Sequence, residues 1–143
     1  MDIKGKTIVI TGGGQGLGRA MAVYLAGSGA CLALIDLNAE KLAETAGLCR
    51  AAGGSAHTYL ANVAREEEVV ATFERIVADT GAVHGLSNNA GILRDGLMIK
   101  VKDGKIEKRM SLAEWQAVID VNLTAGFRLA RAAPDDAFLD ALA

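Results

Sequence analysis

The feature that most constrains this chain is a glycine-rich loop between a β-branched run and a helix pattern. Residues 7–11 read Thr-Ile-Val-Ile-Thr, which is typical of a strand buried on both faces. Gly12, Gly16 and Gly18 follow, and the helix pattern begins at Leu17. Glycines at such a junction allow a tight turn and bring an anion close to free N–H groups at a helix N-terminus. The spacing predicts a dinucleotide pyrophosphate site, with a flexible loop as the alternative; a P-loop is excluded because no Gly-Lys-Ser/Thr follows.

The remainder of the chain repeats the alternation of apolar strand runs and amphipathic helix patterns. We expect strands at 7–11, 31–35, 55–60 and 83–87, and helices at 17–28, 39–52, 65–80 and 111–131. The last helix opens with a capping box, Ser111-Leu-Ala-Glu114. This order implies right-handed crossovers and a parallel sheet with helices on both faces. The sequence therefore predicts an α/β, Rossmann-type doubly wound sheet, truncated after the fourth strand and the helix that follows it.

One segment, about 98–110, interrupts this order. Three apolar residues, Ile99, Val101 and Ile106, are separated by charged ones, and Asp103-Gly104 stands between the two arms. An Asp-Gly pair flanked by alternating residues predicts a β-hairpin. The insertion also carries five basic side chains, those of Lys100, Lys102, Lys105, Lys108 and Arg109. Two interpretations remain open: a solvated excursion, or a contact for a partner subunit or an anionic substrate.

These elements predict a single domain over residues 1–131 with the hairpin inserted in it, followed by an atypical tail at 132–143. The tail contains Pro134 and three aspartates and differs from the apolar fifth strand that a complete doubly wound sheet would have here. A damaged gene, an incomplete sequence and a genuine short protein all fit this ending.

Composition narrows the class of protein. The formal net charge is −2 and 51% of residues are hydrophobic, which is typical of a globular protein and argues against a nucleic-acid surface. No apolar run approaches the ~20 residues that span a membrane, and no signal peptide is evident. Cys31 and Cys49 are expected to be reduced thiols, and His57 and His84 lack the spacing of a metal site. We expect a cytoplasmic protein that binds no metal, nucleic acid or membrane.

Asp36 is the second chemical signal. It stands at the end of the second predicted strand, 18 residues after Gly18. A carboxylate there can accept hydrogen bonds from the adenosine ribose hydroxyls and would repel the 2′-phosphate of NADP. Its neighbours Gln15 and Leu37 are neutral. The sequence predicts NAD in preference to NADP; an acid preceding the second helix is the structural alternative.

The third signal is Asn88-Asn89-Ala90-Gly91, directly after the fourth predicted strand. Together with the Thr11-Gly-x-x-x-Gly-x-Gly18 loop, Asp36 and an asparagine at 122, it resembles the classical short-chain dehydrogenase/reductase family. The likeness is to the N-terminal half of its 3-oxoacyl-carrier-protein reductase-like members, and it runs from about residue 4 to 130. The resemblance implies hydride transfer between a nicotinamide cofactor and a small carbonyl or alcohol substrate, in an enzyme that is commonly a homo-oligomer.

The resemblance also implies roles for particular positions. The cofactor would lie along Gly12, Gln15, Gly16, Leu17, Asp36, Asn62, Val63, Asn89, Ala90 and Gly91. At Asn62 the family has an aspartate beside the adenine; the amide oxygen of Asn62 can still accept from the adenine amine. Asn122 corresponds to the asparagine that holds a water in the family's proton relay, although a simple polar helix residue is the alternative.

The family's catalytic serine, tyrosine and lysine lie beyond that asparagine, and this sequence shows no Tyr-x-x-x-Lys pair. Its two tyrosines, Tyr24 and Tyr59, are each followed four positions later by another residue type. By family the chain is expected to be an NAD(P)-dependent oxidoreductase, with the 143 residues alone inactive. The alternative is a non-catalytic nucleotide-binding fragment or pseudoenzyme subunit.

Overall fold

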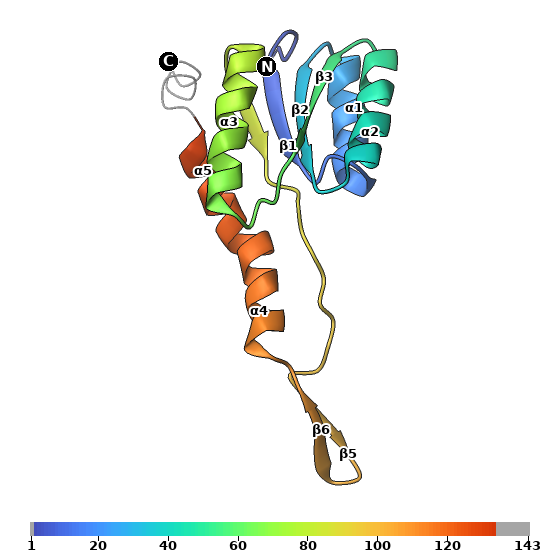
Figure 1. Cartoon of the computed structure of the whole chain (residues 1–143). Coiled ribbons are helices and arrows are strands. Elements are labelled where there is room, and N and C mark those ends of the chain that lie inside the picture. Colours follow the sequence, from blue (N-terminus) through green and yellow to red (C-terminus); the bar gives the residue numbers. More distant parts are fainter. Residues whose placement is uncertain (1, 134–143) are drawn as a thin grey trace.

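The centre of the molecule is a parallel four-stranded sheet in the order β3-β2-β1-β4, seen in a computed structural model that describes residues 2–133 (Figure 1). The strands are β1 (Thr7–Thr11), β2 (Cys31–Asp36), β3 (Ser55–Leu60) and β4 (Gly85–Ser87). The helices that connect them are α1 (Gly16–Gly27), α2 (Ala39–Ala51) and α3 (Glu66–Thr80). This order is that of the first half of a doubly wound sheet, which confirms the predicted Rossmann-type class.

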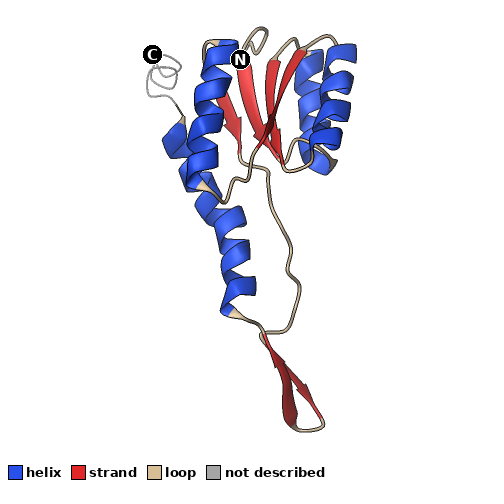
Figure 2. Ribbon diagram, in the orientation of Figure 1, coloured by secondary structure: helices blue, strands red, loops and turns tan. Residues whose placement is uncertain are grey.

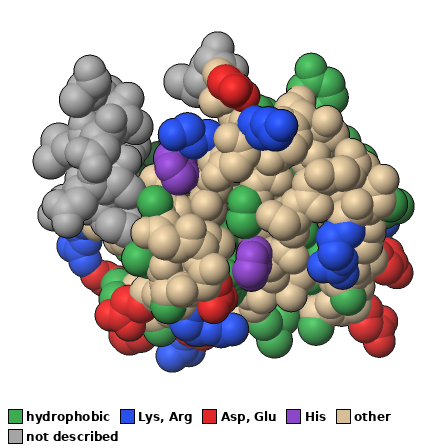
Figure 3. Space-filling model, turned by 90° about the horizontal axis from the view of Figure 1, so that it is seen from above, with side chains coloured by type: hydrophobic (Ala, Val, Ile, Leu, Met, Phe, Trp, Pro, Cys, Tyr) green, Lys and Arg blue, Asp and Glu red, His purple; other side chains and the backbone are tan. Residues whose placement is uncertain are grey.

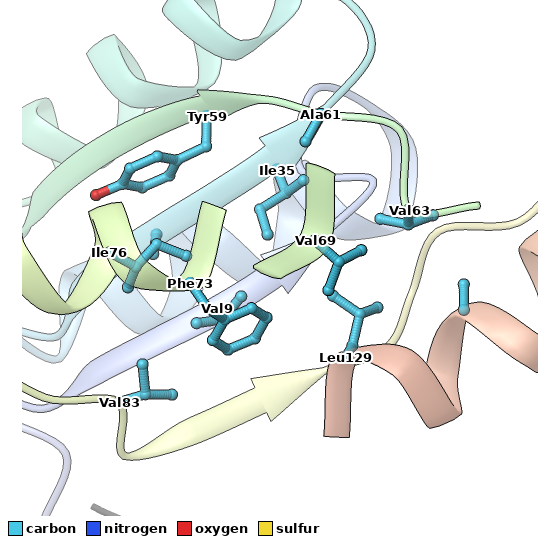
Figure 4. Packing of buried hydrophobic residues seen from close by; sticks show 12 residues of the cluster. Val9, Ile35, Tyr59, Ala61, Val63, Val69, Phe73, Ile76, Val83 and Leu129 are labelled. Carbon is cyan, nitrogen blue, oxygen red and sulfur yellow. The ribbon is translucent and has the colours of Figure 1, made fainter. Parts of the chain in front are cut away.

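Helices cover both faces of the sheet, with α1 and α2 on one side and α3 with α5 (Ala125–Ala132) on the other (Figure 2). Successive side chains of a strand point to opposite faces, so β1 supplies Ile10 to the core under α1 and α2 and Val9 to the opposite core. In β2, Leu34 and Ile35 divide in the same way. The second core is completed by Phe73, Ile76 and Leu129 from the covering helices (Figure 4).

The fourth strand is shorter than the predicted 83–87. β4 pairs with β1 only from Gly85, opposite Ile8, to Ser87, opposite Ile10. At Gly85 a Cβ atom would lie 2.9 Å from Ile8 Cδ1, so the Ile8 side chain packs against the backbone of Gly85 where the ladder begins. Val83 is buried in the core but precedes the ladder. Apolar character therefore predicted its burial correctly and its strand pairing wrongly.

The predicted helix at 111–131 consists of α4 (Leu112–Ile119), a π-helical turn, η1 (Asp120–Thr124), and α5. The capping box is present: Ser111 Oγ accepts from the Glu114 amide, and the Glu114 carboxylate accepts from the Ser111 amide. Hydrogen bonds from Ser111, and then from the Lys108 ammonium, lower the pKa of Glu114 to about 2. The π turn was not predicted, because one extra residue in a turn leaves the apolar pattern of a helix nearly unchanged.

The inserted hairpin is formed by β5 (Ile99–Lys102) and β6 (Lys105–Arg109), and it extends away from the sheet beyond α4 (Figure 1). Asp103 and Gly104 have positive φ angles of 51° and 71°, as a type I′ turn requires. Every residue of its two strands is exposed. The predicted tail at 132–143 lies outside the described residues from 134 onward.

His84, which precedes β4, is hydrogen-bonded to the first residue of β1. This contact lies at the amino ends of the strands, the end of the molecule that Figure 3 shows. Nδ1 of His84 accepts a hydrogen bond from the Thr7 amide at 3.0 Å, and the His84 amide donates to the Thr7 carbonyl at 2.9 Å. The first of these bonds needs an unprotonated Nδ1. Partial burial and then the Lys6 ammonium lower the pKa of His84 below its ordinary value. The folded state therefore favours neutral His84.

This contact predicts an acid-sensitive loss of stability. Because the pKa is lower in the folded state, the contribution of His84 is complete above the unfolded pKa of ~6.5 and falls as the pH drops through and below that value. Denaturant melts between pH 8 and pH 5 should show this fall in the wild type and a smaller one in His84→Gln. His57→Gln is the matched control and should retain the full fall. An identical pH profile for His84→Gln and wild type would contradict the prediction.

Candidate functional site

A cavity of about 420 Å³ opens at the carboxyl ends of the strands, a size within the usual range for small-molecule sites. Its walls come from the loop after β1, the end of β2 and the segments after β3 and β4. All ten residues predicted to contact a cofactor line this cavity: Gly12, Gln15, Gly16, Leu17, Asp36, Asn62, Val63, Asn89, Ala90 and Gly91. The fold thus gathers these ten residues into one cleft, although Gly12 and Gly91 are 79 positions apart in sequence.

The glycines of the first loop are required by close backbone contacts. Gly12 and Gly16 have φ angles of 66° and 54°, which favour glycine. A Cβ at Gly18 would lie 2.1 Å from the Gly12 carbonyl oxygen, and one at Gly12 would lie 3.1 Å from Ala90 Cα. The N-cap residue of α1, Gln15, forms no side-chain capping bond. The first turn of α1 therefore faces the cavity with amide donors that an anion can use.

Thr11 joins this loop to the segment that follows β4. Its Oγ1 accepts from the amides of Asn89 and Ala90, both at 3.0 Å, and donates to the Ser87 carbonyl at 3.4 Å. In return, Asn89 Nδ2 donates to the Thr11 carbonyl at 3.0 Å. Sequence reasoning placed Asn89 at the site but missed the clamp made by Thr11. The only signal was a hydroxyl residue at the end of an apolar strand.

The Asp36 carboxylate is held in place by backbone donors. Oδ2 accepts from the Gly14 amide at 3.0 Å, and Oδ1 accepts from the amides of Leu37 at 2.8 Å and Asn38 at 3.1 Å. These bonds orient the carboxylate at the wall of the cavity and at the same time fasten the glycine loop to the end of β2. Asp36 is thus part of the loop's support as well as a candidate ligand group.

A lysine contacts the side chain of Gln15 at the cavity wall. Lys41, in the first turn of α2, donates from Nζ to Oε1 of Gln15, which lines the cavity. Sequence reasoning examined only the neutral positions Gln15 and Leu37 and overlooked Lys41. Lys41 follows Asp36 by only five residues, which places it in the first turn of α2. That turn packs against the glycine loop, so the spacing could have indicated a contact between Lys41 and Gln15.

Asn122 lies outside the main cavity. It belongs to the π turn, and its carboxamide bonds to both backbone groups of Ile92: the Ile92 amide donates to Oδ1 at 2.9 Å, and Nδ2 donates to the Ile92 carbonyl at 3.0 Å. It also borders a hollow of about 30 Å³ together with Thr11 and Asn88. In this structure Asn122 fastens the segment after Gly91 to the helix.

Neither tyrosine is placed to exchange a proton at the cavity. Tyr24 is exposed on α1 and is absent from the lining of the cavity. Tyr59 is buried, and its hydroxyl donates to Asp79 at 2.8 Å. Burial, followed by the hydrogen bond to Asp79, raises the pKa of Tyr59 above its ordinary value. Within residues 2–133, no tyrosine hydroxyl therefore lines the cavity.

A model of the short chain dehydrogenases matches residues 6–138, nearly the whole chain. The chain belongs to the short-chain dehydrogenase family. It is 38% identical over 130 residues to nodulation protein G of Rhizobium sp. strain N33, covering 91% of this chain and 48% of that protein. It is 39% identical over 140 residues to 3β-hydroxysteroid dehydrogenase 1 of Eggerthella lenta, covering 97% and 50%.

Solved structures agree with this assignment. The structure of NAD⁺-bound xylitol dehydrogenase superimposes with a TM-score of 0.78 at 32% identity, covering 92% of this chain and 48% of that one. The chain thus spans about half the length of the relatives it matches. Within the part of the chain that the structure describes, no helix has the length and apolar character needed to cross a membrane.

The hydrogen bonds of Thr11 to Asn89 and Ala90 predict a loss of stability when the hydroxyl is removed. Thr11→Val preserves the side-chain shape but removes the acceptor of the Ala90 amide and one of the two acceptors of the Asn89 amide, which also donates to the Ser87 carbonyl at 3.1 Å. A donor left without an acceptor costs up to ~1–3 kcal/mol. We expect a lower free energy of unfolding in urea melts. Thr11→Ser retains the hydroxyl and is the matched control, with a smaller loss. Equal destabilisation by valine and serine would show that the methyl group, rather than the clamp, matters.

Proposed function

We propose that this chain is the dinucleotide-binding half of an NAD(H)-dependent oxidoreductase. The oxidoreductase would transfer hydride between the nicotinamide and a small carbonyl or alcohol substrate. The observation that carries the proposal is the Asp36 carboxylate, which three backbone amides hold at the wall of the glycine-lined cavity. Membership of the short-chain dehydrogenase family and the likeness to an NAD⁺-bound relative support it.

The preference for NAD(H) follows from the charge at this wall. A ribose with free hydroxyls can donate to the remaining lone pairs of Asp36, whereas a 2′-phosphate would bring two negative charges against the carboxylate. Lys41 opposes this repulsion, but its Nζ is bonded to the side chain of Gln15. We expect Asp36 to determine the cofactor preference more strongly than Lys41 does. Backbone donors hold the Asp36 carboxylate in place, so it cannot turn away from a 2′-phosphate.

This chain's residues would bind and orient the cofactor. The amides of the first turn of α1 would hold the pyrophosphate, Asp36 the ribose, and Asn62 and Val63 the adenine. The segment Asn89–Gly91 would lie along the cofactor, held in place by Thr11 and, through Ile92, by Asn122. When bound, a nicotinamide supplies or accepts the hydride.

The cofactor preference can be measured by calorimetry with the 143-residue chain. We expect tighter binding of NADH than of NADPH by at least about tenfold, the effect of ~1.4 kcal/mol. Asp36→Ala should weaken NADH binding and narrow this ratio, whereas Lys41→Gln should widen it. Since Asp36→Ala also removes three hydrogen-bond acceptor contacts, its melting temperature without ligand must be recorded beside the ratio. NADPH binding equal to or tighter than NADH binding by the wild type would overturn the preference.

A second prediction concerns turnover by the same polypeptide. A positioned proton donor typically contributes ~10²–10⁴ in rate, and neither tyrosine lies at the cavity. We expect dinucleotide binding without detectable oxidation or reduction of alcohols and carbonyls. Turnover that persists after repurification and is lost in Gly18→Ala would contradict this prediction. It would favour a complete enzyme over the alternative of a non-catalytic nucleotide-binding chain.

A further inference from the structure

The carbonyl of Gly14, in the glycine loop, is held by the guanidinium group of Arg19. Arg19 Nε and Nη2 both donate to this oxygen, at 3.1 Å and 2.6 Å. Nε also donates to Thr45 Oγ1 at 2.9 Å, and Nη2 forms an ion pair with Glu44 Oε2 at 2.8 Å. Arg19 belongs to α1, whereas Glu44 and Thr45 belong to α2. One side chain of α1 therefore fastens the glycine loop to α2.

The hydroxyl of Thr45 cannot replace Arg19 as the donor to this carbonyl. It is buried and lies 3.2 Å from the Gly14 oxygen and 3.0 Å from the Lys41 carbonyl oxygen, but a hydroxyl carries only one hydrogen. The Lys41 carbonyl is the closer of the two, and a carbonyl four residues earlier is a common partner of threonine inside a helix. The Gly14 carbonyl thus depends on the two N–H groups of Arg19.

Gly14 also orients the Asp36 carboxylate. The Gly14 amide donates to Oδ2 at 3.0 Å and is the donor that this oxygen has within residues 2–133, whereas Oδ1 accepts from the amides of Leu37 and Asn38. A Cβ atom on Gly14 would lie 3.0 Å from Oδ2, so the two residues are in close contact. A displaced Gly14 would leave Oδ2 without this donor and would let the carboxylate turn about its Cβ–Cγ bond. Arg19 and Asp36 are thus connected through the backbone of one glycine.

We infer that Arg19 is a positioning residue for cofactor selection: it holds Gly14 in the place from which the Gly14 amide orients the Asp36 carboxylate. The inference rests on the proposed function, in which Asp36 favours NAD(H). Within the described part of the chain, Arg19 is not among the residues that line the cavity, and Glu44 balances its charge. Arg19 therefore acts on the cofactor through Gly14 and Asp36 rather than by contact.

Removal of Arg19 distinguishes this role from a direct effect of charge. If the guanidinium acted by its charge, its loss would weaken the binding of NADPH, the more negative dinucleotide, more than that of NADH, and would widen the preference for NADH. Loss of the support for Gly14 has the opposite effect. A carboxylate that can turn binds the ribose hydroxyls less well and repels a 2′-phosphate less. The two roles thus predict changes of opposite sign in the same ratio.

The experiment measures the dissociation constants of NADH and NADPH by calorimetry on the 143-residue chain. Arg19→Met has no donor for the Gly14 carbonyl, and we expect the preference of at least about tenfold for NADH in the wild type to fall below about threefold. Lys41→Gln removes the same charge but leaves the Gly14 carbonyl bonded to Arg19, and should widen the preference. Glu44→Gln is the matched control: it breaks the exposed ion pair of Arg19, whose charges salt screens, and should change the preference less than about twofold.

Thermal melts without ligand establish that each variant is folded, and Arg19→Lys serves as a second variant. Lysine keeps the charge but replaces the planar guanidinium with a single ammonium group, so its ratio should lie between those of the wild type and Arg19→Met. An unchanged or widened ratio in Arg19→Met, whatever its melting temperature, would overturn the inference while leaving the proposed function intact. If Arg19→Met does not fold, an Arg19→Lys ratio equal to or above that of the wild type would overturn it. Failure of the wild type to bind either dinucleotide would overturn the proposed function itself.

Discussion

The close contact between the first glycine loop and α1 is the constraint on which the site depends. The Gly12 carbonyl occupies the space that a side chain at Gly18 would need, and the backbone of Ala90 approaches Gly12 from the next strand. Glycine at both positions lets β1, α1 and the segment after β4 converge without a side chain between them. The glycine loop thereby brings its backbone to the cavity wall, which suits a ligand whose pyrophosphate is bound by amide groups.

Polar hydrogen bonds, rather than contacts of the apolar cores, connect the segments that form the cavity wall. Thr11 ties the loop to the segment after β4, Asp36 ties it to the end of β2, and Asn122 ties Ile92 to the π turn. The two cores lie on the faces of the sheet and set the positions of the strands. The cross-links then set the positions of individual groups at the strand ends. Residues that look like ligand contacts in sequence thus also act as structural supports.

Sequence patterns predicted the fold well because they report local physics. β-Branched runs and the 3.6-residue period located the sheet strands and most helices, while Asp103-Gly104 and Ser111–Glu114 located a turn and a cap whose chemistry is complete within a few residues. The errors came where a distant partner decides the outcome. The ladder of β4 begins only at Gly85, where that strand's backbone approaches Ile8.

By itself the sequence determined the α/β class, the strand–loop–helix unit at Gly12–Gly18 and ten of the residues that surround the cavity. Their spacing along the chain and the parallel topology suffice to bring them to one edge of the sheet. The tertiary structure decided how each side chain is used: Asp36 is anchored by Gly14, Asn122 binds Ile92, Lys41 reaches Gln15, and Asn62 turns its oxygen to the backbone. A residue's type states what it can donate or accept, but its partners depend on backbone atoms that only folding brings within hydrogen-bonding distance.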